Sequence, residues 1–199
     1  MKKIIAEKQQ LRKFFQEKRT NLSTEKKHEL SKLISQNFIN FLLKNNIDFE
    51  NKIFGSFIAT NSEADPSYIE EFLKNHNCQI CYPKIIENSK VLQFIHNPQK
   101  LDFVSNKRFP KILEPAFGKI LIPNYLLVPL LAFDDNLQRL GMGQGFYDNT
   151  IEDLKVKNPN LNSFGIAFDF QRSEQTLPTL KTDLSLDFVV TNQNIFTSK

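Results

Sequence analysis

Three of the chain's six glycines lie close together, between Gly141 and Gly145 in the segment 139–148, RLGMGQGFYD. They follow an apolar run over residues 126–133, LLVPLLAF, which has the length and composition of a buried strand. Pro129 within that run favours an edge position, a bulge or the end of the strand. After Gly145 the apolar residues keep roughly helical spacing, with acidic residues in the first turns. The pattern predicts a strand, a glycine loop and a helix in succession, and so an α/β fold.

Such a loop is suited to phosphate. Its backbone N–H groups can point at an anion, and the N-terminus of the following helix adds a partial positive charge. Arg139 can neutralise phosphate charge, whereas Asp148 would repel a phosphate unless a divalent cation lay between them. The loop therefore indicates a phosphate ligand with magnesium, and a glycine-rich turn without a ligand is the alternative.

The loop matches neither standard phosphate-binding template. Phe146 and Tyr147 stand where a Walker A loop has lysine and Ser or Thr, and the spacing GxGxG differs from the dinucleotide fingerprint GxGxxG. The segment resembles instead the RLGxGxGYYD signature of the 5-formyltetrahydrofolate cyclo-ligases, also called methenyltetrahydrofolate synthetases. Further segments resemble the same family in sequence order: KxxLR at Lys8, Leu11 and Arg12, the stretch through Arg19, Leu22 and Ser23, and residues 126–141, 164–171 and 180–191.

The resemblance implies a fold and a reaction. The fold is a single three-layer α/β/α domain over residues 1–199 with a mostly parallel central sheet, of the NagB/RpiA/CoA-transferase type. The reaction is the ATP-dependent cyclisation of 5-formyltetrahydrofolate, free or polyglutamylated, to 5,10-methenyltetrahydrofolate, with Mg²⁺ as cofactor and ATP as co-substrate. The alternative is a catalytically impaired protein that binds folate or nucleotide without turnover.

The resemblance also implies a set of site residues. Arg139 and Asp148 are the expected catalytic residues, and Asp148 and Asp187 the expected magnesium ligands, with Asp183 as a neighbouring acid. The expected substrate-binding residues are Ile58, Glu63 and Tyr147. The expected ATP-binding residues are Lys8, Arg12, Arg139, Leu140, Gly141, Met142, Gly143, Gln144, Gly145, Phe146 and Tyr147.

Taken without the resemblance, several of these residues have ordinary interpretations. Lys8 and Arg12 lie one turn apart on a predicted helix and would form a solvated basic face. Glu63 would be an acid at a helix entry, where the helix dipole favours it. Asp183 and Asp187 would each be an ordinary loop aspartate.

The chain departs from the family pattern at a few places. Leu130 and Leu137 occupy positions where the family usually has glycine, and we expect Leu137 to forfeit an easily reached positive φ before Arg139. Thr182 stands where histidine often precedes Asp183.

Composition bounds the remaining possibilities. The chain has 199 residues, is 40% hydrophobic and carries a net charge of +4, which suits anionic small molecules but is too small to argue for nucleic acid. No apolar stretch approaches the length of a membrane span or of a signal-peptide core, so we expect a cytoplasmic protein without membrane contact. We also expect it to act as a monomer. Cys78 and Cys81 lie in a predicted strand, where positions three apart face opposite sides, and are expected to be packed thiols.

Periodicity places the remaining elements. Helices are expected from about 3 to 18, from Ser23 or Thr24 to about 44, and from the Asp65–Pro66 pair to about 73. Strands are expected over 52–59, 79–82 and 91–95, and near residues 126, 164 and 188. The proline-rich segment 97–123 is expected to be a long, partly irregular connection.

Overall fold

The computed structural model describes residues 2–60, 62–97 and 102–197. Its α-helices are α1 (Lys2–Thr20), α2 (Thr24–Lys44), α3 (Ser67–Asn75) and α4 (Phe146–Lys157), and Asp169–Gln171 form a 3₁₀ turn. Its strands are β1 (Ile53–Gly55), β2 (Gln79–Lys84), β3 (Gln93–His96), β4 (Phe103–Ser105), β5 (Leu113–Pro115), β6 (Lys119–Ile120), β7 (Tyr125–Pro129), β8 (Ala132–Phe133), β9 (Arg139–Leu140), β10 (Asn162–Ile166), β11 (Phe188–Val190) and β12 (Ile195–Thr197).

The central sheet is mostly parallel. Its strand order is β12-β11-β10-β7-β1-β2-β3-β6, and the inner strands β11, β10, β7, β1 and β2 pair in parallel. Strands β12, β3 and β6 add antiparallel edges. Two small hairpins, β4–β5 and β8–β9, stand outside the sheet.

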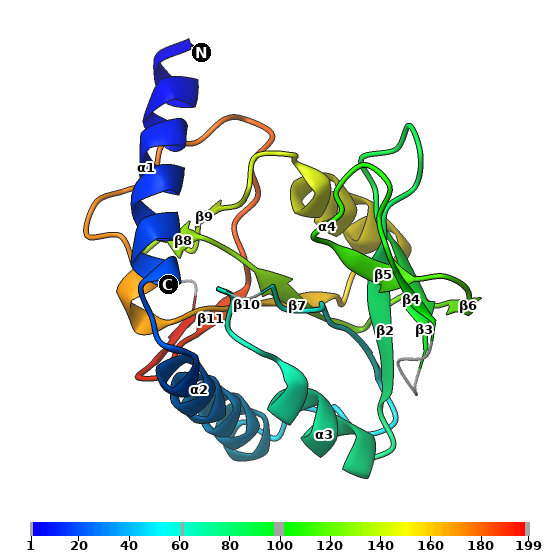
Figure 1. Cartoon of the computed structure of the whole chain (residues 1–199). Coiled ribbons are helices and arrows are strands. Elements are labelled where there is room, and N and C mark those ends of the chain that lie inside the picture. Colours follow the sequence, from blue (N-terminus) through cyan, green and yellow to red (C-terminus); the bar gives the residue numbers. More distant parts are fainter. Residues whose placement is uncertain (1, 61, 98–101, 198–199) are drawn as a thin grey trace.

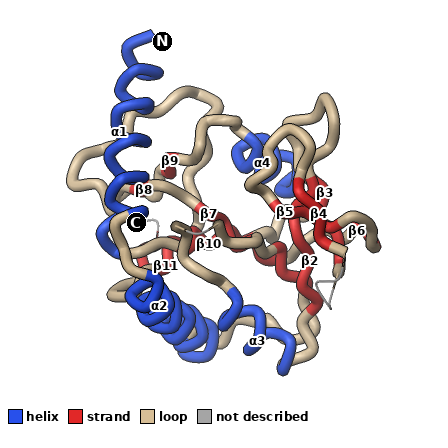
Figure 2. Tube along the Cα trace, viewed as in Figure 1, coloured by secondary structure: helices blue, strands red, loops and turns tan. Residues whose placement is uncertain are grey.

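Helices cover both faces of this sheet, and α1 stands apart from it (Figure 1). On one face, Phe38 and Leu42 of α2 and Ile69 and Leu73 of α3 share an apolar cluster with strand residues such as Phe164. On the other face, α4 packs Ile151 and Leu154 against a second cluster. Figure 2 shows α2 and α3 together on one side and α4 on the other. The expected α/β/α arrangement is confirmed.

Helix α1 packs against the β8–β9 hairpin instead of a sheet face. Phe15 of α1 is 3% exposed and shares a third, small cluster with Leu131, Ala132, Leu140 and Leu177. This contact fixes α1 beside the hairpin that carries the glycine loop.

The helix boundaries follow local signals. Ser23 caps α2 by accepting a hydrogen bond from the N–H of Lys26 at 3.2 Å. The Asp65 carboxylate accepts from the N–H of Ser67 at 2.9 Å, and α3 begins at Ser67 one residue after Pro66. The Pro and Asp therefore start this helix as expected, shifted by one position.

The strands add to one expectation and correct another. The segment 97–123, expected to be a long and partly irregular connection, also contains the short strands β4, β5 and β6, of which β4 pairs with β5 and β6 pairs with β3. The apolar run 126–133 is not one strand, since β7 ends at Pro129 and β8 turns away to pair with β9. Pro129 thus marks a strand end.

The two cysteines are buried free thiols, as expected. Burial raises the pKa of the Cys81 thiol. In the part of the chain that the structure describes, no helix combines the length and apolar character needed to cross a membrane.

Candidate functional site

The glycine loop connects β9 to α4 and brings the backbone close to α1. Gly143 has φ 93° and Gly145 has φ 73°, so side chains at either position would be strained. A Cβ atom on Gly143 would lie 3.0 Å from Cζ of Arg12. Gly145 immediately precedes α4, and no side chain caps the first N–H groups of that helix. The loop therefore leaves a helix N-terminus open to an anion.

The hairpin before the loop is held by Asp134. This carboxylate is 1% exposed, and it accepts hydrogen bonds from the N–H groups of Asn136, Gln138 and Leu177 at 2.9, 3.1 and 2.8 Å. Leu137 sits within this turn at φ 56° and is fully buried. The expectation that leucine would forfeit a positive φ here is wrong, because burial of the side chain outweighs the local backbone cost.

Helix α1 supplies the cations that face the loop. Arg12 Nε donates to the carbonyl oxygen of Gly141 at 2.9 Å. Lys8, which is 7% exposed, pairs with the carboxylate of Asp183. Burial lowers the pKa of the Arg12 guanidinium, and the charge of Asp183 acts in the opposite direction. The structure thus confirms that Lys8 and Arg12 do not form a fully solvated basic face.

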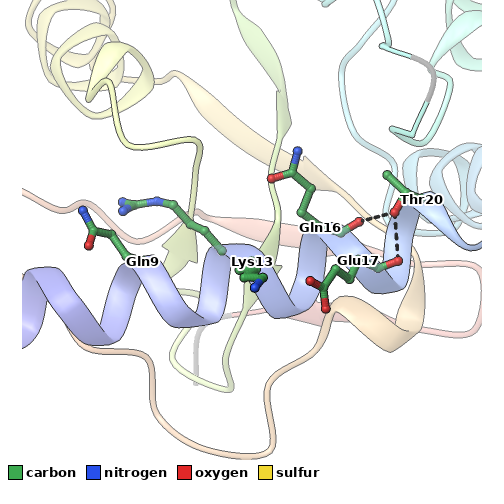
Figure 3. Close-up of a pocket in the computed structure, with 6 residues that line it drawn as sticks. Gln9, Lys13, Gln16, Glu17 and Thr20 are labelled. Atoms are coloured by element: carbon green, nitrogen blue, oxygen red, sulfur yellow. Dashed lines mark hydrogen bonds between the residues drawn. The ribbon is translucent and has the colours of Figure 1, made fainter.

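A shallow hollow runs along this side of α1 (Figure 3). It is lined by Gln9, Arg12, Lys13, Gln16, Glu17 and Thr20, which recur at helical spacing. The hollow shares Arg12 with the glycine loop, so it adjoins the loop along the helix.

Arg139 and Asp148 form an ion pair at the opening of α4. Arg139 Nη2 lies 3.0 Å from Asp148 Oδ1, and the two side chains are 5% and 18% exposed. The guanidinium also lies 5.6 Å from the ring centroid of Tyr147. Burial, and next the charge of Glu63, raise the pKa of the Tyr147 phenol, while Arg139 lowers it. Tyr147 therefore shares its electrostatic environment with the predicted folate-binding and nucleotide-binding residues.

Asp148 contacts the segment that carries Asp183. Asp148 Oδ1 accepts a hydrogen bond at 3.4 Å from the N–H of Leu184, the residue that follows Asp183 in the chain. Magnesium favours one or two carboxylates together with water and phosphate oxygens. Over residues 2–60, 62–97 and 102–197 there is no cluster of three or more His, Cys, Asp or Glu side chains suited to a metal. Asp148 is paired with Arg139 and Asp183 with Lys8, so a magnesium ion here would take most of its ligands from phosphate and water.

Asp187 is not next to Asp148. Its carboxylate accepts from Lys155 Nζ at 3.0 Å and from the N–H and hydroxyl of Ser163 at 2.8 and 2.7 Å. Lys155 lies in the last turn of α4 and Asp148 in the first, about 10 Å apart along the axis. Asp187 precedes β11, which runs parallel to β10, and its bond to Lys155 places it at the last turn of α4. The expectation that Asp148 and Asp187 meet at one metal ion is therefore wrong.

Two of the predicted folate-binding residues, Ile58 and Glu63, lie between β1 and α3, and the third, Tyr147, lies in the first turn of α4. Glu63 is half-buried, and its Oε2 accepts from the N–H of Thr60 at 2.8 Å. Ile58 packs against the cluster beneath α2 and α3.

The other predicted loop residues differ in burial. Leu140 is buried, Met142 is 58% exposed, and the carbonyl of Gln144 accepts from Lys90 Nζ at 3.0 Å. The Phe146 ring meets Phe109 edge-on, with 6.0 Å between centroids.

Sequence reasoning missed three contributors. Lys90 reaches the loop from a turn with no distinguishing pattern. Asp134 carried a turn signal, as one of two aspartates after an apolar run. Gln16 follows Arg12 by one helical turn, and that spacing would have placed it on the same face.

Comparison with known proteins gives a consistent result. The model of the 5-formyltetrahydrofolate cyclo-ligase family matches residues 4–192. The chain is 26% identical to the 5-formyltetrahydrofolate cyclo-ligase of Mycoplasma pneumoniae, over 94% of this chain and 99% of that protein. It is 31% identical to the Escherichia coli K12 protein of the same name, over 70% and 78% respectively.

Solved structures agree. A 5,10-methenyltetrahydrofolate synthetase from M. pneumoniae superposes with a TM-score of 0.73 at 25% identity, covering 93% of this chain and 98% of that one. The corresponding structure from Aquifex aeolicus gives 0.74 at 25% identity, covering 96% and 92%.

Proposed function

Because the chain belongs to the 5-formyltetrahydrofolate cyclo-ligase family, we propose that it converts 5-formyltetrahydrofolate and ATP to 5,10-methenyltetrahydrofolate, ADP and phosphate. The observation that carries the proposal is that Arg12 of α1 bonds the glycine loop at Gly141, while Arg139 at the start of the loop pairs with Asp148 of α4. Lys8 lies one helical turn before Arg12 and pairs with Asp183. That arrangement supports binding of a polyanion beside the open end of α4.

The substrate sets the chemical problem. Its formyl group on nitrogen-5 is an amide, whose oxygen is a poor leaving group. The formyl oxygen attacks the γ-phosphate of ATP and ADP leaves. Nitrogen-10 then adds to the activated carbon, loses its proton to solvent, and phosphate departs with the former formyl oxygen. Because the substrate supplies both nucleophiles, the protein contributes mainly positioning and neutralisation of charge.

Each residue has a role in this proposal. Arg12 and Lys8 hold the phosphates from α1, and the backbone from Gly141 to Gly145 approaches them from the other side. Arg139 neutralises charge that develops on the transferring phosphoryl group. Its ion pair with Asp148 holds the guanidinium at the opening of α4.

Magnesium belongs to the proposal as well. Asp148, with Asp183 nearby, would hold the ion against the phosphates, where it would supply further neutralisation of their charge. Glu63, Ile58 and Tyr147 would contact the folate. We also propose that the chain works as a single-domain cytoplasmic monomer on mono- or polyglutamylated folate.

Absorbance at the methenyl-folate band tests the reaction. Mixing the purified protein with 5-formyltetrahydrofolate, ATP and magnesium should give a rise that requires ATP. Binding of the folate without any rise would identify the protein as an impaired binder. The absence of both folate binding and methenyl product would overturn the proposal.

A further inference from the structure

Arg19, near the end of α1, is a buried arginine to which the proposed reaction assigns no role. It is 3% exposed, and it joins three parts of the chain. Nη1 donates to the carbonyl oxygen of Leu130 at 3.1 Å, and Nη2 donates to the hydroxyl of Ser62 at 3.0 Å. Nη1 also lies 3.9 Å from Oε1 of Glu63.

The first contact fixes the guanidinium to the scaffold. Leu130 directly follows β7, and its carbonyl also accepts a hydrogen bond from Gln171 Nε2 at 2.7 Å. The same Nε2 group donates to the carbonyl of Leu131 at 3.0 Å. Two buried side chains thus converge on one carbonyl at the carboxyl end of a central strand. Arg19 is therefore held by the rigid part of the fold and not by the loop that it touches.

The contact with Glu63 is electrostatic. Glu63 Oε2 is occupied by the N–H of Thr60 at 2.8 Å, and the backbone N–H of Glu63 donates to the Thr60 carbonyl at 3.0 Å. Oε1 faces Arg19 at a distance too long for a hydrogen bond. Among the described residues no donor bonds Oε1, so this oxygen is free to accept an N–H from a ligand. Arg19 holds the turn through Ser62 and keeps a positive charge behind the carboxylate.

We propose that Arg19 is a positioning residue for Glu63, through which it sets the affinity for the folate and not for the nucleotide. The inference rests on the proposed function, in which Glu63 contacts the folate. Arg19 itself touches no reacting atom. The planar guanidinium forks between Leu130 and Ser62, and a lysine ammonium in its place cannot span both acceptors in that geometry.

The test compares Arg19→Lys, Ser62→Ala, Glu63→Gln and the double variant Arg19→Lys/Glu63→Gln. The matched control is Arg172→Lys, which alters an exposed arginine paired with Asp135. The dissociation constant of 5-formyltetrahydrofolate is measured by calorimetry without ATP, and the affinity for a non-hydrolysable ATP analogue is measured separately. These readouts need no turnover, so failure of the proposed reaction is distinguishable from failure of this inference.

We expect Arg19→Lys to weaken folate binding about tenfold, and Ser62→Ala about threefold, with nucleotide affinity within twofold of wild type. In the Glu63→Gln background, Arg19→Lys should add less than threefold, because the residue through which it acts is already altered. Additive effects in the double variant would overturn the proposal. So would equal losses of folate and nucleotide affinity, or unchanged folate binding. If Arg19→Lys does not fold, Ser62→Ala decides by the same criteria.

Discussion

The two ends of α4 carry similar residues and differ in what those residues do. At the first turn, Asp148 pairs with Arg139 beside an open glycine loop. At the last turn, Lys155 pairs with Asp187, whose other oxygen is held by Ser163. The N-terminal end of α4 leaves backbone N–H groups for a ligand. At the C-terminal end, Asp187, which precedes β11, joins α4 to β10 through Lys155 and Ser163. The acid at the first end therefore keeps its place in the proposed site, whereas the acid at the last end holds elements of the fold together.

The comparison is tested most strongly by paired substitutions. Asp148→Asn should lower kcat for methenyl formation by roughly 10²–10³-fold, because it releases Arg139 and removes a proposed magnesium ligand. Asp187→Asn should keep kcat within about threefold and lower the free energy of unfolding by about 1 kcal/mol. Absorbance kinetics and urea unfolding measure the two effects, and a larger loss of kcat in Asp187→Asn would reverse the assignment.

The loop glycines sharpen the same contrast. Gly143→Ala should raise the dissociation constant for an ATP analogue about tenfold, because a Cβ there lies 3.0 Å from Arg12 at φ 93°. Gly145→Asn should change it less than threefold, since the nearest atom is 3.4 Å away and asparagine adopts a positive φ at a smaller strain cost than other side chains. Calorimetric titration of both variants is the measurement. Equal affinities would show that the approach of Arg12 is unimportant.

Leu137 tests whether the hairpin stores strain. Leu137→Gly relieves the positive φ but removes a fully buried side chain, so we expect a net loss of about 1–3 kcal/mol in stability. Turnover of the folded enzyme should stay within twofold. A more stable variant would mean that strain, and not packing, dominates the turn.

The smallest effect concerns alkaline stability. The folded state raises the pKa of Tyr147, so its phenol stays neutral while the unfolded chain ionises near pH 10. Its contribution to stability is therefore complete below about pH 10 and falls as the pH rises above that value. Tyr147→Phe should make this decline shallower by at most about 1.4 kcal/mol per pH unit, measured by urea unfolding between pH 9 and 11. An unchanged slope would contradict the assignment.

The sequence predicted what depends on local pattern. The glycine loop, the helix after Gly145 and the cap at Ser23 are short-range signals, and the structure has them. The strand predicted over 126–133 is divided into β7 and β8. The position of Asp187 was wrong because chain spacing does not say which end of α4 faces β11. The contact of Arg19 with Leu130 joins residues 111 apart in the chain, and no pattern in the sequence marks it.

The central claim is that α1 and the glycine loop together bind the nucleotide. Titration of an ATP analogue into wild type and Arg12→Gln tests it most directly, with the exposed Arg172→Gln as control. We predict that Arg12→Gln weakens binding about tenfold or more while the control matches wild type, because Arg12 contacts the loop at Gly141 whereas Arg172 pairs with Asp135. Equal affinity in Arg12→Gln and wild type would contradict the claim.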